Sequence, residues 1–388
     1  MLASTLSENS AVSVLLIEAG GPDSNPWIHI LIGYFKTIGN PATDCCFQTE
    51  PVTGLANRTI FWPRGKVVGG SGAINGLIYV RGQSENYDRW QQLDCEDWGW
   101  HDVLPYFMRS ERQERGPSEF HGNSGPLGVS DNRADFAICD RFVDAAVASG
   151  LPRNDDCNDG NPEGVGYYQT TTWNGFRSST ATGYLKPARK RSNLKIVTSA
   201  LCERILIEQG CANGIAFRSK DGTLMKAYCQ REVLLCAGTI RPESRGEIRL
   251  KSAEPAAAPL IRANDLDTEN DRRTAIEALK LSREICGQSP LSEVIINEHA
   301  PGPKAVTDQQ LLNHVRQTAA TLFHPVGTCR MGADPDAVVD PQLRLKGVAG
   351  LRVVEASIMP EITSGNTNAP VVMIAEKASD MILAKSDA

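Results

Sequence analysis

The amino-acid sequence predicts an α/β fold with a parallel sheet, and three observations support this prediction. Residues 12–17 form an apolar run that ends in Glu18 and two glycines, which is typical of a strand buried on both faces. A second run of this kind covers residues 233–237, and we expect it to rejoin the same parallel sheet. Residues 2–7 have the pattern of a helix end, so we expect the chain to begin partway through a βαβ unit.

Hydrophobic periodicity and turn signals predict the other elements. Helices are expected at residues 85–93, 135–149, 265–286 and 308–322, with one more after Pro370. Strands are expected at residues 194–198, 202–208, 214–219, 224–228, 232–237 and 351–355. The pairs Asn213-Gly214 and Asp221-Gly222 are hairpin signals. Because proline disfavours helix at the residue before it, His324 is expected just beyond the end of the fourth helix.

Composition excludes several classes of protein. The chain has 388 residues and a formal net charge of −6, which argues against a nucleic-acid partner. No run approaches the roughly 20 apolar residues of a transmembrane helix, and no signal peptide is evident. Eleven cysteines without a Cys-x-x-Cys pair argue against a metal site and favour a cytoplasmic location, or a peripheral one at the inner membrane. The acidic residues 154–166 do not match a calcium loop in register, and the aromatic residues 98–107 are expected in the core.

Residues 62–82 contain six glycines beside arginine, lysine and asparagine. The simplest interpretation is a glycine-rich bend between two strands, although successive free N–H groups also form a nest for an anion. A Walker loop is excluded because Lys66 is followed by valine. A hydrolase elbow is excluded because the glycine required two positions after Ser71 is Ala73.

Glu18 has two interpretations at this stage. An acid at the end of such a strand hydrogen-bonds the ribose of a dinucleotide, but a solvent-facing carboxylate is common there as well. A Gly-x-Gly-x-x-Gly about 20 residues earlier would decide between them, and that position lies before Met1.

Three blocks, residues 63–75, 323–332 and 351–370, resemble the glucose–methanol–choline (GMC) flavin oxidoreductases, and most closely their bacterial choline and alcohol dehydrogenase branch. The resemblance implies an FAD-binding Rossmann-like domain with an incomplete first βαβ unit, and a reduced α+β substrate domain. Residues 1–240 would form the FAD-binding region with inserted segments. Residues 241–388 would complete that domain and carry the catalytic residues.

The resemblance also implies roles for single residues. Glu18 would hold the adenosine ribose, and Cys202 would meet the adenine beside Ala237 and Gly238. The residues that would follow the pyrophosphate and the flavin are Val68, Asn75, Gly76, Leu77 and Ile78. Ala356 and the segment with Asn366 and Asn368 would close over the isoalloxazine. Because Ile74 stands where some members carry a flavin-linked histidine, we expect FAD to be bound non-covalently.

The implied reaction is oxidation of a choline-like or primary alcohol. His324 would take the hydroxyl proton while the carbon gives hydride to flavin N5. Asn366 is the expected second catalytic residue, and Asn368 is close enough in sequence to be its rival. The residues alone also allow His324 to be a structural histidine at a helix end. The electron acceptor stays open among oxygen, a quinone and a carrier protein.

Two departures from the family weaken this expectation. The first glycine loop is absent, and much of the substrate-domain sheet is missing at Ile240-Arg241; Glu355 also replaces an aspartate. We therefore expect weak FAD affinity and poor or no activity, because a helix N-terminus that favours the pyrophosphate is lost. The alternatives are an inactive remnant of such an enzyme and a Ser-His hydrolase that uses Ser71 and His324.

Overall fold

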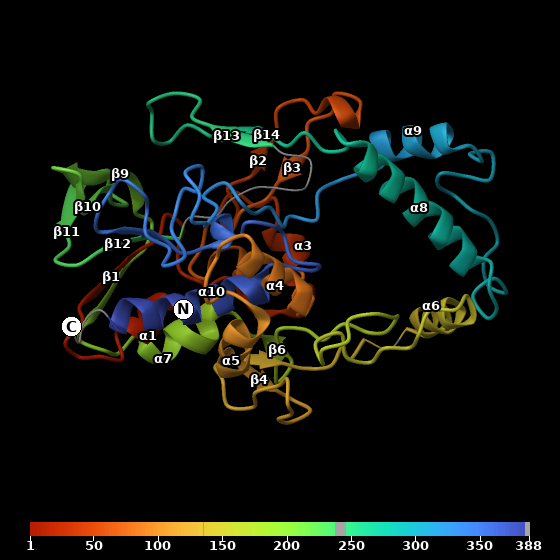
Figure 1. Cartoon of the computed structure of the whole chain (residues 1–388), viewed down its shortest axis with the longest axis horizontal. Helices are drawn as coiled ribbons and strands as arrows, with labels where there is room; N and C mark the ends of the chain where they lie inside the picture. Colours follow the sequence, from red (N-terminus) through yellow and green to blue (C-terminus); the bar gives the residue numbers. More distant parts are fainter. Residues whose placement is uncertain (135, 237–245, 385–388) are drawn as a thin grey trace.

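The computed structural model describes residues 1–134, 136–236 and 246–384 (Figure 1). Its helices are α1 (Leu2–Leu6), α2 (Pro26–His29), α3 (Tyr34–Thr37), α4 (Ser84–Gln92), α5 (Trp100–Ser110), α6 (Ala137–Ala148), α7 (Lys186–Ala188), α8 (Glu269–Cys286), α9 (Asp308–Thr318) and α10 (Asn368–Ala384). Its strands are β1 (Val14–Ile17), β2 (Phe47–Gln48), β3 (Phe61–Trp62), β4 (Glu111–Gln113), β5 (Leu127–Val129), β6 (Thr172–Trp173), β7 (Phe176–Arg177), β8 (Leu194–Val197), β9 (Leu201–Glu208), β10 (Cys211–Arg218), β11 (Leu224–Tyr228), β12 (Val233–Leu235), β13 (Glu247–Arg249), β14 (Leu260–Arg262) and β15 (Leu351–Val353).

Two parallel strand pairs carry the two ends of the expected cofactor site. β1 pairs with β8 in the register Val14↔Leu194, and β12 pairs with β15 in the register Val233↔Leu351. We expected β12 to join the sheet that contains β1, and this was wrong for the described residues. Among the described residues the two pairs are separate two-stranded sheets, so their strands do not hydrogen-bond to each other. Side chains of β1 and β12 instead pack against one shared hydrophobic cluster.

The strands β9, β10 and β11 form an antiparallel meander in the order β11-β10-β9 (Figure 1). The hairpin signal at Asp221-Gly222 is confirmed, since Gly222 has φ +87° between β10 and β11. The signal at Asn213-Gly214 was wrong. The β9–β10 turn is at Gln209-Gly210, and Gly214 lies inside β10 at a shift in register. A Cβ at Gly214 would lie 2.1 Å from the Ala227 carbonyl oxygen, so close strand packing explains this glycine.

The predicted helices near residues 85, 135, 265 and 308 are confirmed as α4, α6, α8 and α9. Only α9 ends early: it stops at Thr318, so the expectation that His324 directly follows this helix was wrong. The Thr318 hydroxyl donates to the His314 carbonyl, and Ala319 already has ψ +145°. His324 therefore lies in a loop, after Phe323 at φ +68°.

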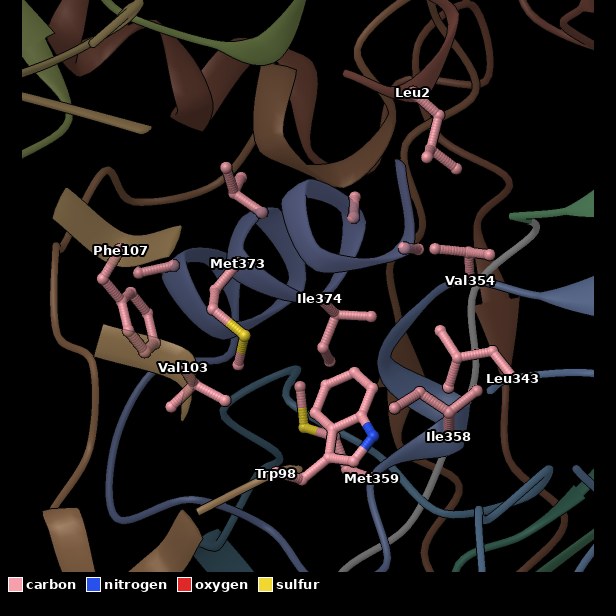
Figure 2. Packing of buried hydrophobic residues seen from close by; sticks show 14 of the residues in the cluster. Leu2, Trp98, Val103, Phe107, Leu343, Val354, Ile358, Met359, Met373 and Ile374 are labelled. Atoms are coloured by element: carbon pink, nitrogen blue, oxygen red, sulfur yellow. The ribbon is translucent and has the colours of Figure 1, made fainter. Parts of the chain in front are cut away.

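The core is organised around α10 (Figure 2). This helix is buried on nearly all sides, which is typical of a helix at the centre of a domain. Met373 and Ile374 pack in one cluster with the side chains of Trp98 and Phe107, and all four are 0% exposed. Burying each such side chain stabilises the fold by about 1.5–3 kcal/mol. The aromatic residues 98–107 therefore lie largely in the core, as predicted. The buried helix α10 also fixes the position of the segment just before it, which contains Asn366 and Thr367.

Candidate active site

The glycine-rich segment forms a turn of backbone that is open on one side. It contains a 3₁₀ turn, Gly70–Ala73, and the left-handed Gly69 at φ +99° precedes it. Val68 is buried, and its N–H donates to the Gly21 carbonyl at 3.0 Å, which fixes the loop to the end of β1. A Cβ added at Gly70 or Gly76 would meet no heavy atom within 4 Å. The loop therefore exposes main chain that a ligand can approach closely.

Glu18 stands at the end of β1, where the sequence placed it. Its Oε1 accepts a hydrogen bond from the Gly20 N–H at 2.7 Å. Burial raises the pKa of this carboxyl, and the hydrogen bond from Gly20 opposes that effect. The Glu18 carbonyl accepts from the Ala200 N–H at 2.9 Å, so Cys202, exposed at the start of β9, lies only two residues beyond this contact.

Residues 75–78 are held by their own turn and by a neighbouring hairpin. The Asn75 Oδ1 accepts from the Leu77 N–H at 3.1 Å, and Leu77 takes the left-handed conformation at φ +72°. The Leu77 carbonyl accepts from the Thr171 N–H at 2.8 Å, while Ile78 forms a bridge with Thr170. This segment is therefore fixed in position beside Gly76.

His324 and Asn366 lie in direct contact. The Asn366 amide Nδ2 is 2.7 Å from His324 Nε2, and the other ring nitrogen, Nδ1, is 3.1 Å from the Thr367 hydroxyl. Donation by Asn366 requires a lone pair on Nε2, which places the ring proton on Nδ1, facing Thr367. The Thr367 N–H also points at Nδ1, at 3.4 Å, and this contact would require a lone pair on that nitrogen. We assign the proton to Nδ1 because the contact between Nε2 and the Asn366 amide is much shorter.

The electrostatic surroundings keep His324 neutral. Burial, followed by the positive charge of Arg64, lowers the pKa of His324 to about 4. Burial also lowers the pKa of Arg64, to about 10, and the negative charge of Glu355 is the largest effect that opposes this. Arg64 therefore remains a cation at neutral pH, and its charge acts on both His324 and Glu355.

Contacts join these groups into one site. A Cβ at Gly72 would lie 3.1 Å from the Asn368 Oδ1, so the glycine turn meets the start of α10. Asn368 thus faces the glycine turn, whereas Asn366 faces His324. Ala356 directly follows Glu355 and begins the 3₁₀ turn Ala356–Ile358. Ala237 and Gly238, and with them the junction at Ile240-Arg241, lie outside the described residues.

Three residues of this region have roles that sequence reasoning missed. They are Arg64 beside His324, Thr367 at the His324 ring, and Arg177, which hydrogen-bonds Asn75. Arg64 and Thr367 lie inside the blocks that carried the family resemblance, which was a usable signal for them. Nothing in the sequence around Arg177 indicates that its side chain is buried.

The described residues contain no group of three or more His, Cys, Asp or Glu side chains placed to hold a metal ion. Within the same residues, every helix is too short or too polar to cross a lipid bilayer.

Comparison with known proteins identifies the family. Models described as GMC oxidoreductase match residues 10–243 and 242–375. An alcohol dehydrogenase (acceptor) of Pseudomonas putida is 30% identical over 518 residues, covering 100% of this chain and 94% of that protein. An oxygen-dependent choline dehydrogenase of Sinorhizobium fredii is 30% identical over 514 residues, covering 99% and 93%. Both matches are longer than this chain, so the relatives contain segments without a counterpart here.

A solved structure agrees with these matches. Pyridoxine 4-oxidase from Mesorbium loti is 26% identical and superposes with a TM-score of 0.94, covering 99% of this chain and 96% of that one. The predicted α/β fold is thereby confirmed. The chain belongs to the GMC oxidoreductase family and is an FAD-dependent oxidoreductase.

Proposed function

We propose that this chain binds FAD non-covalently along the glycine turn and oxidises a choline-like or primary alcohol, with His324 as the base. The observation that carries this proposal is the 2.7 Å contact between His324 Nε2 and the Asn366 amide. A histidine held neutral, with its lone pair turned toward an amide donor, is prepared to accept a proton from a hydroxyl group.

The part of the site that the glycine turn forms has room for FAD. Gly70 and Gly76 leave open space where any side chain would stand, so an extended cofactor has room against the main chain. Glu18 lies at the end of β1 for the ribose, and Cys202 follows close by for the adenine. Ile74 is buried and carries no nucleophile, which supports non-covalent binding.

Each polar group beside His324 has a task in the proposed reaction. Bound FAD supplies the acceptor for the hydride of the alcohol carbon. His324 Nε2 removes the hydroxyl proton, and the Thr367 hydroxyl accepts the Nδ1 proton and so fixes the tautomer. The Asn366 amide orients the substrate oxygen and donates to it as negative charge develops.

Two further positive fields favour a negatively charged substrate oxygen. Arg64 disfavours protonation of His324 before the alcohol arrives, and its charge attracts an alkoxide. Asn366 and Thr367 directly precede α10, whose N-terminus carries the positive end of the helix dipole. Both effects stabilise the negative charge on the substrate oxygen, whereas Arg64 opposes the positive charge that His324 gains in the same step.

We also propose a cytoplasmic location. All eleven cysteines are free, including the adjacent Cys45 and Cys46, as expected in a reducing compartment. Fractionation that recovers the protein in the periplasm would contradict this, and recovery with washed membranes would favour the peripheral alternative.

A second candidate is an inactive remnant that does not retain the cofactor. The separation of the β1–β8 pair from the β12–β15 pair favours it, because the two ends of the cofactor site then lack a common sheet. The segments of the relatives that have no counterpart here point the same way.

One experiment separates the two candidates. The purified chain is titrated with FAD, and the complex is then mixed anaerobically with choline and with a series of primary alcohols. Loss of the flavin absorbance with one alcohol supports the enzyme, and reoxidation by oxygen, a quinone or a carrier protein identifies the acceptor. Absence of FAD binding supports the remnant, and flavin that no alcohol reduces contradicts the proposed reaction. Flavin mass on the denatured protein would contradict non-covalent binding.

A further inference from the structure

Arg177 is a buried residue that joins three separate segments around the glycine turn. It belongs to the β6–β7 hairpin and is 3% exposed. Its Nε donates to the Ile28 carbonyl at 2.8 Å, and Nη2 donates to the Asn75 carbonyl at 2.8 Å. Nη1 donates to the Asn75 Oδ1 at 2.6 Å and to the Gly72 carbonyl at 3.3 Å. One guanidinium group thus fixes both ends of the turn that runs from Gly72 to Asn75.

The charge of Arg177 has no acidic partner among the described residues. All four acceptors are neutral carbonyl or amide oxygens. The two other arginines buried to a similar degree each pair with a carboxylate, Arg81 with Glu111 and Arg352 with Glu232. Burial alone lowers the pKa of Arg177, to about 10, so it stays protonated at neutral pH. A buried cation without a counter-ion is unfavourable unless an anion binds nearby.

The position of this charge indicates which anion. Arg177 lies directly behind Gly72 and Asn75, and the neighbouring Gly70 and Gly76 leave open space at the turn. Asn75 links Arg177 to the following residues, since its Oδ1 also accepts a hydrogen bond from the Leu77 N–H. The cofactor proposed to lie there carries a negatively charged pyrophosphate, and its flavin gains negative charge on reduction.

We propose that Arg177 is a positioning residue that shapes the glycine turn before FAD arrives and gives the turn the positive charge that favours this anionic cofactor. The inference rests on the proposed placement of FAD along residues 68–78. It assigns no contact between Arg177 and the substrate. The shaping of the turn is the geometric part of this proposal, and it requires the forked guanidinium. The positive charge is the electrostatic part, and it requires only a cation.

Two substitutions separate these parts. Arg177→Met removes the fork and the charge, whereas Arg177→Lys keeps the charge and loses the fork. Arg352→Met is the matched control, because Arg352 is equally buried but lies on β15 and pairs with Glu232. The measurements are the FAD dissociation constant of the apoprotein by fluorescence titration, the midpoint potential of the bound flavin, and the stability of each apoprotein to urea.

We expect Arg177→Met to weaken FAD binding by roughly ten- to a hundredfold, the loss typical of hydrogen bonds from a charged donor. Its midpoint potential should become more negative, since a positive charge no longer opposes the charge gained on reduction. Arg177→Lys should weaken binding and keep the wild-type potential. Arg352→Met should lower stability and keep the wild-type affinity.

Other outcomes overturn the inference. Wild-type affinity and potential in both Arg177 variants would leave Arg177 a purely structural residue. The same conclusion follows if affinity falls in proportion to stability in all variants, Arg352→Met included. If Arg177→Met does not fold, wild-type affinity in Arg177→Lys is sufficient to refute the geometric part. Failure of the wild-type chain to bind FAD overturns the proposed function as well, so the two failures are distinguishable.

Discussion

Two histidines of this molecule, the half-buried His324 and the buried His121, have opposite surroundings. His324 lies near the cation Arg64, its ring contacts the neutral side chains of Asn366 and Thr367, and its pKa falls to about 4. Burial also lowers the pKa of His121, but hydrogen bonds to Asp156 and Glu111 outweigh this and raise it to about 9. His121 Nδ1 is 3.0 Å from a Glu111 oxygen, and Nε2 is 3.3 Å from an Asp156 oxygen.

The difference lies in the sign of the neighbouring charges. At neutral pH one ring is a free base beside the glycine turn, and the other is a cation that ties β4 to the acidic residues 154–166. Desolvation lowers the pKa of both histidines. At His324 it is the larger cause and Arg64 adds to it, whereas at His121 the two carboxylates outweigh it. Whether a histidine shielded from solvent is a neutral base or a structural cation therefore depends on its charged neighbours as well as on its burial.

The largest expected effect tests the role of His324 as the base. His324→Ala should lower the rate of alcohol oxidation by about 10²–10⁴-fold and leave FAD affinity unchanged. Stopped-flow reduction of the bound flavin measures the rate, and His121→Gln serves as the control that keeps it. Undiminished flavin reduction in His324→Ala would falsify the assignment.

A smaller effect is expected for the amide beside His324. Asn366→Ala should lower kcat by about 10²–10³-fold, as for removal of one donor to a developing oxyanion. Asn368→Ala is the matched control, because its side chain faces Gly72 and not His324. If Asn368→Ala loses more activity than Asn366→Ala, the assignment between these two asparagines must be reversed.

The stability of the fold should follow His121 in the alkaline range. Its folded pKa is raised above 6.5, so its stabilisation is complete below pH 6.5 and is lost as pH rises through 9. The full difference is about 3 kcal/mol. Urea unfolding of the wild type and of His121→Gln at pH 6 to 10, a range spanning roughly these values, measures it. Equal pH dependence of the two proteins would show that His121 is neutral in the folded state.

The smallest expected effect concerns the charge of Arg64. His324 must be deprotonated to act, so activity should fall as pH drops through about 4. Arg64→Met should move this acid limb to higher pH, because one of two causes of the low pKa is removed. The movement should be partial, since burial is the larger cause and remains. An acid limb at unchanged pH would mean that Arg64 does not act on His324.

The sequence was sufficient for the family, for the strand that ends at Glu18 and for the block around His324. It was not sufficient for relations that depend on side-chain direction. Asn366 and Asn368 are two positions apart, and only the start of α10 determines which of them meets the ring. The buried fork of Arg177 and the charge of Arg64 on His324 depend on contacts between distant segments, which local patterns do not encode.

The same limit applies to the strands. Asn213-Gly214 has good turn chemistry but lies within β10, because close packing against β11 uses the glycine. The sheet that β12 joins was also predicted incorrectly, since pairing depends on which strand lies beside it and not on its own composition.

The separation of the two parallel pairs has a consequence for local opening. β1 and β12 each have one hydrogen-bonded neighbour among the described strands, so alternate amides on the other edge of each have no sheet partner there. Such amides exchange with solvent through small fluctuations, without unfolding of the whole domain. In the proposed placement of FAD, the adenosine end of the site, at Glu18, is therefore expected to open locally more readily than the end that α10 holds. Cofactor dissociation would accordingly begin at the adenosine end and leave the flavin end in place longest.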